Sequence, residues 1–274
     1  MGKFDGLLLC TDLDDTLLTT DKKVSPDNSR AIEYFKSEGG LFTFATGRVP
    51  AGAKLMLDFV HPNAPMVCFN GGAIYDFEQD KILWSRTLGA EALEVVEYVD
   101  KMFESAGIEV CTDDKNYFSK TNKIVEEHKV FEKLPDNYLD YHMIEEKWNK
   151  VLFMVETEEM PQLRNLIALS PFFNDFTFVQ SSPWYYELLP KNASKGEGLM
   201  YLADLLGVDR KHTIAVGDNE NDIKLIEMAG KSVAVANAIG EIKNAADYVI
   251  REDNNSSAIA AVIKMLDSGE IVLP

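Results

Sequence analysis

One stretch near the N-terminus decides the fold: Gly6-Leu7-Leu8-Leu9-Cys10-Thr11-Asp12-Leu13-Asp14-Asp15-Thr16. Its apolar part, residues 6–10, predicts a buried β-strand, and the acidic part follows that strand directly. In an extended segment, side chains two residues apart point to the same side, so we expect Asp12 and Asp14 to face one site. Two carboxylates held close together repel each other unless a cation or a shared proton relieves them. The pattern favours metal-assisted chemistry at a strand end, with a solvated acidic loop or a helix cap as the alternative.

Apolar runs and helical patterns alternate on either side of this stretch. Ser25-Pro26 is typical of a helix start, and Gly39-Gly40 is typical of a helix end. After them we expect a strand over 41–45, a helix over about 51–60 and a strand over 66–69. The C-terminal part repeats the pattern, with helices expected over 195–206, 222–229 and 256–266 and strands over 213–216, 233–236 and 248–250. Apolar strands separated by helices indicate an α/β fold whose parallel sheet is covered on both faces.

The middle of the chain, about 84–187, differs in character. We expect two helices there, over 90–106 and 161–169, and strands of an antiparallel sheet over 108–112, 117–120, 150–156 and 176–180. A block of this kind between two α/β halves indicates an inserted domain. The predicted division is a Rossmann-like core at 1–83 and 188–274 and an inserted α/β domain at 84–187.

The composition restricts the partners. The 274 residues carry a formal net charge of −18, which repels nucleic acid and anionic membrane surfaces. No apolar run approaches the roughly 20 residues that span a bilayer, and no export signal is evident, so we expect a cytoplasmic protein with no membrane partner. Cys10, Cys68 and Cys111 form neither a disulfide framework nor a C-x-x-C pair, so they are expected to be small buried side chains in a reducing compartment.

A second carboxylate cluster follows the predicted strand over 213–216, in Gly217-Asp218-Asn219-Glu220-Asn221-Asp222. Asp218 lies at the end of that strand, as Asp12 lies at the end of the first, and ligands bind beyond the carboxyl ends of parallel strands. A small set of oxygen ligands suits Mg²⁺, which keeps several waters. Asp222 could instead be only the N-terminal charge of the following helix.

Three further segments carry polar groups at strand ends or at a helix start. Thr46-Gly47-Arg48 follows the second strand, where a hydroxyl and freed backbone N–H groups can hold phosphate oxygens, although Thr-Gly turns are common. Asn70-Gly71-Gly72 follows the third strand and could be a plain hairpin turn. Lys195 stands at a predicted helix start, which cations normally avoid, so a nearby anion explains it better than exposure at the surface. One ammonium beside Mg²⁺ would give an acidic protein the positive pocket that an anionic substrate needs.

These motifs, in this order, resemble the haloacid dehalogenase superfamily, and the fit is closest to its Cof-type phosphatases with a type IIB cap. The resemblance covers nearly the whole chain and rests on residues 8–18, 44–48, 69–72, 189–196 and 217–222. Asp15 departs from the glycine that many relatives carry. The resemblance implies that the inserted block is a cap that closes over the site, excludes bulk water and selects the substrate.

The resemblance also implies roles for single residues. Asp12 would be the nucleophile that forms an aspartyl-phosphate, and Asp14 would be the general acid and base. Mg²⁺ would be held by Asp12, the backbone carbonyl of Asp14 and Asp218, with Asp222 ordering water around the metal. Thr46 and Lys195 would bind the phosphoryl oxygens. Asn221 would contact the phosphoryl group or help to orient Lys195. Gly47 and Asn70 would line the pocket.

The expected function is hydrolysis of a small phosphorylated metabolite, such as a sugar phosphate, by an Mg²⁺-dependent phosphatase. A phosphomutase of the same superfamily and a non-catalytic protein that binds a phosphorylated ligand are the alternatives. Candidate selectors of the substrate in the cap are Lys115, Tyr117 and Trp184, although packing or surface roles suit them as well. The sequence carries no signal for the physiological substrate or for the oligomeric state.

Overall fold

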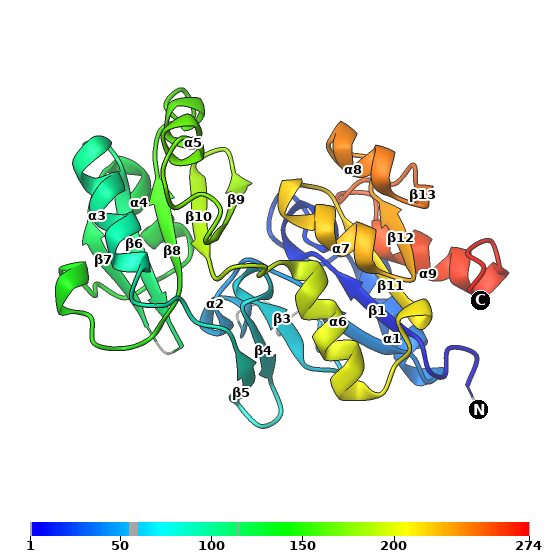
Figure 1. The fold of residues 1–274 in the computed structure, drawn as a ribbon. Helices are drawn as coiled ribbons and strands as arrows, with labels where there is room; N and C mark the ends of the chain where they lie inside the picture. The colour runs from blue at the N-terminus through cyan, green and yellow to red at the C-terminus, as the bar shows by residue number, and fades with distance from the viewer. Residues whose placement is uncertain (1, 55–59, 114, 274) are drawn as a thin grey trace. The chain divides into compact units, whose positions relative to one another are not determined.

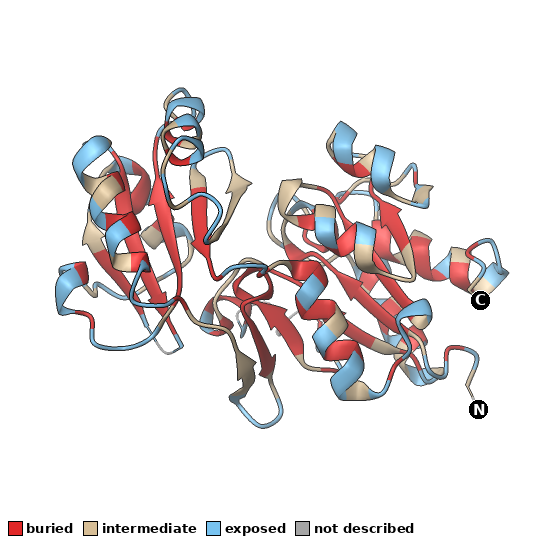
Figure 2. Ribbon diagram, in the orientation of Figure 1, coloured by how far each residue is buried: buried red, intermediate tan, exposed pale blue. Residues whose placement is uncertain are grey.

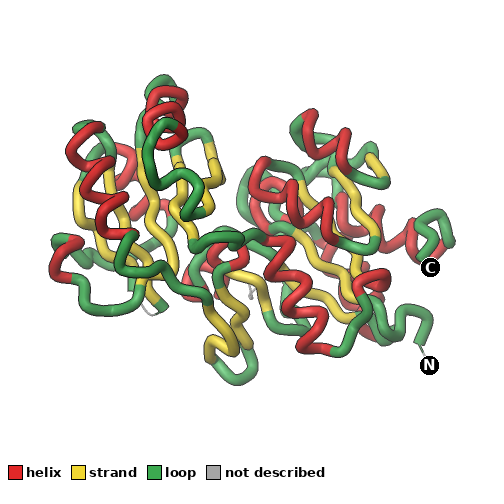
Figure 3. The backbone as a smooth tube through the Cα atoms, viewed as in Figure 1, coloured by secondary structure: helices red, strands yellow, loops and turns green. Residues whose placement is uncertain are grey.

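The computed structural model describes residues 2–54, 60–113 and 115–273 (Figure 1). The chain divides into two compact units, residues 1–84 with 194–274 and residues 85–193. Buried residues concentrate in the strands of each unit and on the helix faces packed against them (Figure 2). Both units combine helices with β-sheets (Figure 3), so the predicted α/β class is confirmed.

The first unit is built on a five-stranded parallel sheet with the strand order β13-β12-β11-β1-β2. Leu8 of β1 pairs with Leu41 on one side and with Thr213 on the other. The carboxyl ends of β1, β2 and β11 therefore lie at one edge of the sheet, and the predicted Rossmann-like arrangement is confirmed. The strands are β1 (Leu8–Thr11), β2 (Leu41–Phe44), β11 (Thr213–Gly217), β12 (Lys231–Ala234) and β13 (Tyr248–Val249).

Helices pack on both faces of this sheet. α6 (Lys195–Leu206) packs with α7 (Ile223–Met228), and α1 (Pro26–Ser37) packs with α9 (Ala258–Ser268). Figure 1 shows α6 and α7 in front of the strands and α1 behind them. Leu199 and Leu202 of α6 share an apolar cluster with Leu8 and Cys10, so α6 covers the face that the even-numbered residues of β1 present.

The helix boundaries follow from local capping. α1 begins as predicted, because the Ser25 side chain accepts the N–H of Asn28 (3.1 Å) and Pro26 needs no hydrogen bond at the first position. The helix predicted over 51–60 begins as α2 (Pro50–Lys54), and residues 55–59 lie outside the described residues. α8 (Gly240–Ala245) has no counterpart in the prediction.

A smaller three-stranded sheet adjoins β2, in the order β3-β4-β5. Its strands are β3 (Met66–Cys68), β4 (Ala73–Asp76) and β5 (Lys81–Ser85). β3 runs parallel to the chain after β2 through a bridge between Ala45 and Val67, and antiparallel to β4. Asn70-Gly71-Gly72 is therefore the turn of a hairpin, with φ of 53° at Asn70 and 95° at Gly71. β4 and β5 are missing from the prediction because short strands joined by polar residues give little periodicity.

The second unit contains a five-stranded antiparallel sheet in the order β7-β6-β8-β10-β9. α3 (Ala92–Met102) and α5 (Met160–Ala168) pack on one face, in an apolar cluster that includes Val99, Val151 and Leu163. The strands are β6 (Gly107–Thr112), β7 (Asn116–Lys120), β8 (Trp148–Met154), β9 (Thr177–Ser182) and β10 (Tyr185–Leu189).

The prediction of only two helices in this unit is wrong. A third helix, α4 (Lys123–Phe131), begins at Asn122, whose side chain accepts the N–H of Val125 (2.9 Å), and packs near β6. Its apolar stripe is too short to give a clear helical period, and only Ile124, Val125 and His128 are buried. β10 is also missing from the prediction. In the part of the chain that the structure describes, no helix has the length and apolarity required to cross a bilayer.

Candidate active site

Asp12 lies at the carboxyl end of β1, at the sheet edge where β2 and β11 also end. Its backbone N–H donates to the carbonyl of Val216 (2.9 Å), and its own carbonyl accepts from the Thr11 hydroxyl (2.8 Å). The chain then turns through Leu13–Leu17, with a positive φ of 58° at Asp15. The predicted nucleophile is thus held at a well-anchored backbone position, and only 5% of its surface is exposed.

Lys195, the first residue of α6, is fully buried against two carboxylates. Its Nζ donates to Asp12 Oδ1 (2.6 Å) and to Asp222 Oδ1 (2.6 Å). Burial lowers the pKa of this ammonium, but the charges of Asp12 and Asp222 outweigh that effect and raise it above its usual value. Ser194 caps the helix by accepting the N–H of Glu197 (3.2 Å). The structure excludes an exposed surface lysine and shows the nearby anions that the sequence indicated.

Three buried carboxylates converge beside this lysine. One oxygen from each of Asp12, Asp218 and Asp222 lies within 4.8 Å of the others. Burial and the charge of Asp222 raise the pKa of Asp218 to about 7 and raise that of Asp12 well above its usual range. One ammonium cannot offset three buried carboxylates, so the cluster attracts a proton or a cation. Because all the donors are carboxylate oxygens, they fit the hard divalent cation that the sequence predicts for this site.

Asp222 fits both interpretations of the sequence, because it belongs to the carboxylate cluster and also caps the following helical turn. Its Oδ2 accepts the backbone N–H groups of Asp218 (3.0 Å) and Asn219 (3.2 Å), which closes a capping box at the start of the helical turn. Its Oδ1 accepts from Lys195 (2.6 Å). Asp222 therefore ties the loop after β11 to the start of α6, and it also brings a carboxylate into the acidic cluster.

Asp14 is bound to cations outside this cluster. Its Oδ2 accepts from Arg48 Nε (2.9 Å), and its Oδ1 accepts from Arg48 Nη2 (2.9 Å) and Lys22 Nζ (2.9 Å). Burial would raise the pKa of Asp14, but the hydrogen bonds and charges of Arg48 and Lys22 outweigh it and hold the pKa well below its usual range. The carboxylates of Asp12 and Asp14 therefore pair with different cations instead of sharing one partner.

The remaining predicted residues meet where β2 and β3 end. Thr46 Oγ1 accepts the N–H of Arg48 (3.1 Å), which leaves its hydroxyl hydrogen for another acceptor. The N–H of Asn70 donates to the Thr46 carbonyl (3.0 Å), and Asn221 Nδ2 donates to Asn70 Oδ1 (3.1 Å). A Cβ at Gly47 would lie 3.0 Å from Asn70 Nδ2, so the turn packs closely on Asn70. Asn221 thus contacts Asn70, and no hydrogen bond to Lys195 is seen among the described residues.

Sequence reasoning missed roles for three residues. Arg48 and Thr16 stood inside motifs already singled out, and Thr16 Oγ1 donates to Asp218 Oδ1 (2.6 Å). The position of Thr16 next to Asp15, and the place of Arg48 in the turn after the second strand, were usable signals. Lys22 gave none, because its contact with Asp14 depends on a loop with a positive φ of 55° at Lys22.

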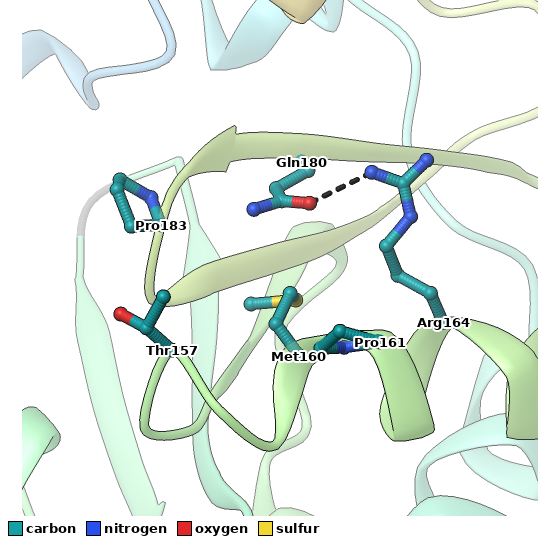
Figure 4. Close-up of a pocket in the computed structure, with 6 residues that line it drawn as sticks. All are labelled: Thr157, Met160, Pro161, Arg164, Gln180 and Pro183. Atoms are coloured by element: carbon teal, nitrogen blue, oxygen red, sulfur yellow. Dashed lines mark hydrogen bonds between the residues drawn. The ribbon is translucent and has the colours of Figure 1, made fainter.

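A pocket of about 590 Å³ opens in the second unit, beside the start of α5 and the edge strand β9 (Figure 4). Arg164 donates to Gln180 Oε1 (2.7 Å) at its polar end. The lining residues are Thr157, Met160, Pro161, Arg164, Gln180 and Pro183. No carboxylate is among them, so this pocket does not share the chemistry of the acidic cluster.

The chain matches a known protein family. Residues 9–263 match the family model of haloacid dehalogenase-like hydrolases. The chain belongs to this family. Its resemblance to the haloacid dehalogenase superfamily, first indicated by the order of the motifs, is thereby confirmed.

Individual members of the family agree in length and fold. The chain is 31% identical over 266 residues to a Streptococcus pyogenes protein that is named as an inferred phosphatase. The alignment covers 94% of this chain and 97% of the relative. The chain is 27% identical over 292 residues to a Bacillus subtilis 5-amino-6-(5-phospho-D-ribitylamino)uracil phosphatase, covering 96% and 98%. A solved subclass IIB sugar phosphatase shares the fold, with a TM-score of 0.81 at 18% identity over 97% of this chain and 100% of the other. The protein is therefore a phosphatase of the haloacid dehalogenase family.

Proposed function

We propose that the protein is an Mg²⁺-dependent phosphatase that hydrolyses a small phosphorylated metabolite through an aspartyl-phosphate on Asp12. One observation carries the proposal: the buried Lys195 bridges Asp12 and Asp222 (2.6 Å each) beside Asp218, at the carboxyl ends of parallel strands. A carboxylate at such an edge, next to a buried cation and to other oxygen ligands, suits attack on a phosphoryl group.

The reaction proceeds in two transfers. The Asp12 carboxylate attacks phosphorus in line, and the P–O bond to the leaving group breaks. Asp14, which first takes up a proton from solvent as its contacts with Arg48 and Lys22 loosen, gives that proton to the leaving oxygen. Water then attacks the aspartyl-phosphate while Asp14 takes up a proton from that water, and free phosphate leaves with Asp12 regenerated. Lys195, the Thr46 hydroxyl and Asn221 stabilise the phosphoryl oxygens during both transfers.

The acidic cluster would hold the metal ion. The side chains of Asp12 and Asp218 and the backbone carbonyl of Asp14 are the proposed ligands, and Asp222 supports them through its bonds to the N–H groups of Asp218 and Asn219. When bound, Mg²⁺ supplies the positive charge that lets a carboxylate approach a phosphoryl anion. Without that charge, the excess of carboxylates over ammonium would repel the substrate.

The second unit is proposed to be the cap that selects the substrate. All the proposed catalytic side chains come from the first unit, so residues 85–193 are available for recognition of the leaving group. One relative acts on a phosphorylated ribityl compound, which supports a polar, sugar-like leaving group. A screen of phosphorylated metabolites would identify the substrate, with release of free phosphate as the measurement.

Hydrolysis of p-nitrophenyl phosphate by the purified protein tests the proposal. Wild type with Mg²⁺ should release phosphate, Asp12→Asn should be inactive, and removal of the metal with EDTA should abolish turnover. Full activity of Asp12→Asn would overturn the mechanism, and activity in EDTA would overturn the metal requirement. Return of the phosphoryl group to the substrate without release of phosphate would indicate a phosphomutase, and the absence of any turnover would indicate a binding protein.

A further inference from the structure

The proposed reaction gives a role to Asp14 but none to Arg48 and Lys22, the two cations bound to it. Both oxygens of the Asp14 carboxylate accept from these cations, each at 2.9 Å. A carboxyl group that protonates a leaving oxygen has to turn one of its own oxygens toward that oxygen. Arg48 and Lys22 must therefore give up at least part of their contact with Asp14 during the proposed reaction.

The two cations are anchored through their own backbones. The Arg48 N–H donates to Thr46 Oγ1 (3.1 Å), and its carbonyl accepts the N–H of Phe69 (3.2 Å). The Lys22 N–H donates to the carbonyl of Thr19 (2.8 Å). Arg48 is thus tied to the residue proposed to bind phosphoryl oxygens, so its position does not depend on Asp14 alone.

Their distance from the leaving group follows from hydrogen-bond lengths. Asp14 must reach the leaving oxygen, and it already reaches Arg48 and Lys22, so both cations stand within about 6 to 8 Å of that oxygen. This is the reach of a leaving group of two or three carbon atoms. The side chains are 10% exposed for Arg48 and 28% exposed for Lys22, so both are partly desolvated.

The charges around this place suit an oxyanion. The Nε and Nη2 edge of Arg48, which now holds Asp14, matches the two oxygens of a carboxylate or a phosphate. Asp15 Oδ1 lies 3.8 Å from Lys22 Nζ, and its side chain is 58% exposed, so water screens its effect. An anionic leaving group would be repelled by a chain of net charge −18 unless local cations received it.

We propose that Arg48 and Lys22 form a second anion-binding subsite, which receives an oxyanion carried by the leaving group as Asp14 turns toward the leaving oxygen. The substrate class is then a phosphomonoester with a carboxylate or a second phosphate two or three carbons from the ester. This inference rests on the proposed function, in which Asp14 is the general acid.

Competition against p-nitrophenyl phosphate hydrolysis tests the subsite, because the probe itself has no second anion. The first pair of competitors is 3-phosphoglycerate and glycerol 3-phosphate, which differ by a carboxylate in place of a hydroxymethyl group. The second pair is propane-1,3-diyl bisphosphate and 3-hydroxypropyl phosphate, which tests a phosphate in the same way. Within at least one pair, the compound that carries the second anion should have a wild-type inhibition constant about 10- to 100-fold lower than the compound that lacks it. The pair with the larger ratio identifies the oxyanion.

Variants assign the preference to the two cations. Arg48→Met should bring the ratio of inhibition constants close to one, and Lys22→Met should reduce it several-fold. Lys23→Met is the matched control, since it removes the same charge from the neighbouring exposed lysine, and its ratio should equal that of wild type. Effects that act through Asp14 on both members of a pair cancel in this ratio. If Arg48→Met does not fold, Lys22→Met alone still tests the proposal.

Two results would overturn the subsite. The first is equal inhibition constants within both pairs in wild type, and the second is an unchanged ratio of inhibition constants in both Arg48→Met and Lys22→Met. In each case p-nitrophenyl phosphate is still hydrolysed, so the proposed function stands. Absence of p-nitrophenyl phosphate hydrolysis by wild type would instead reject the proposed function, and the subsite with it.

Discussion

Lys195 and the carboxylates around it set the electrostatics of the site at the scale of single residues. The ammonium is fully buried between Asp12 and Asp222, and Asp218 adds a third carboxylate close by. Burial disfavours each charged carboxylate, and their mutual repulsion adds to that cost. A proton can relieve the cluster at low pH, and a divalent cation can relieve it at higher pH.

The free energy of unfolding of the metal-free protein should therefore fall as the pH rises from about 4 to about 7, where Asp218 titrates. The pKa of Asp218 is raised from 3.8 to about 7 in the folded protein, so the folded state binds more protons than the unfolded state between these values. This contribution to stability is complete below about pH 4 and is lost as the pH approaches 7. Thermal unfolding in EDTA should show the fall, and Mg²⁺ should raise Tm more at pH 8 than at pH 5.

Asp218→Asn is the control for this pH dependence. It removes the titrating carboxylate while keeping a similar shape, so its Tm should change less between pH 4 and 7, and Mg²⁺ should raise it less. An identical pH profile in wild type and Asp218→Asn would show that other groups cause the dependence.

Asp14→Asn should reveal the general acid through the leaving group. For an alkyl phosphate, kcat/KM should fall on the order of 10²-fold or more, because the alkoxide then leaves without a proton. For p-nitrophenyl phosphate, kcat/KM should fall much less, because nitrophenolate is stable without protonation and kcat/KM reports only the first transfer. Steady-state kinetics with both substrates make the comparison. An equal loss with both would mean that Asp14 has a different role.

The hairpin between β3 and β4 supports the site at the scale of elements. Gly71, with φ of 95°, packs so closely on α6 that a Cβ there would lie 1.8 Å from the carbonyl oxygen of Ser194. Gly71→Ala should therefore displace the start of α6 and Lys195 with it, lowering Tm and reducing kcat by about 10-fold or more. Gly6→Ala is the matched control, since Gly6 also has positive φ (82°) but meets no atom within 4 Å. Normal kcat in Gly71→Ala would contradict this coupling.

Elements whose signal is local could be predicted from the sequence. α1 and α6 start where Ser25 and Ser194 cap them, and α6 has the predicted bounds. α4 was missed because its apolar stripe is short, and β10 was missed because the charged Glu187, which is buried against Lys150, interrupts its apolar run. The site residues also divide into those with a local sequence signal and those whose contacts depend on the fold. The motif positions of Asp12 and Lys195 are local, whereas the partners of Asp14 come from separate loops that only the fold brings together.

The division of labour between the two units can be tested at the scale of the whole molecule. Asp12, Thr46, Lys195, Asp218 and Asp222 all lie in the first unit. Exchange of residues 85–193 for the corresponding unit of a relative should change the ranking of phosphorylated metabolites by about 10-fold or more in kcat/KM. Hydrolysis of p-nitrophenyl phosphate and its Mg²⁺ dependence should persist in the chimera. An unchanged ranking would show that the first unit selects the substrate.

The overall class was predictable because the order of the motifs spans nearly the whole chain and matches one family. The change from apolar to alternating strands is the sequence signal for a separate block at about 84–187, and the compact second unit covers residues 85–193. Cytoplasmic location stays a prediction.

The pairing of β1 with β11 has a consequence for biosynthesis. Leu8 pairs with Thr213 in the sheet, so β1 is synthesised about two hundred residues before β11, one of its two neighbouring strands. The second unit, residues 85–193, is continuous and has its own apolar cluster, so it can fold while the nascent chain is still growing. Lys195, Asp218 and Asp222 emerge after it. A chain released before residue 222 therefore carries Asp12 but lacks Asp222 from the charge cluster around it, and we expect such a chain to be inactive.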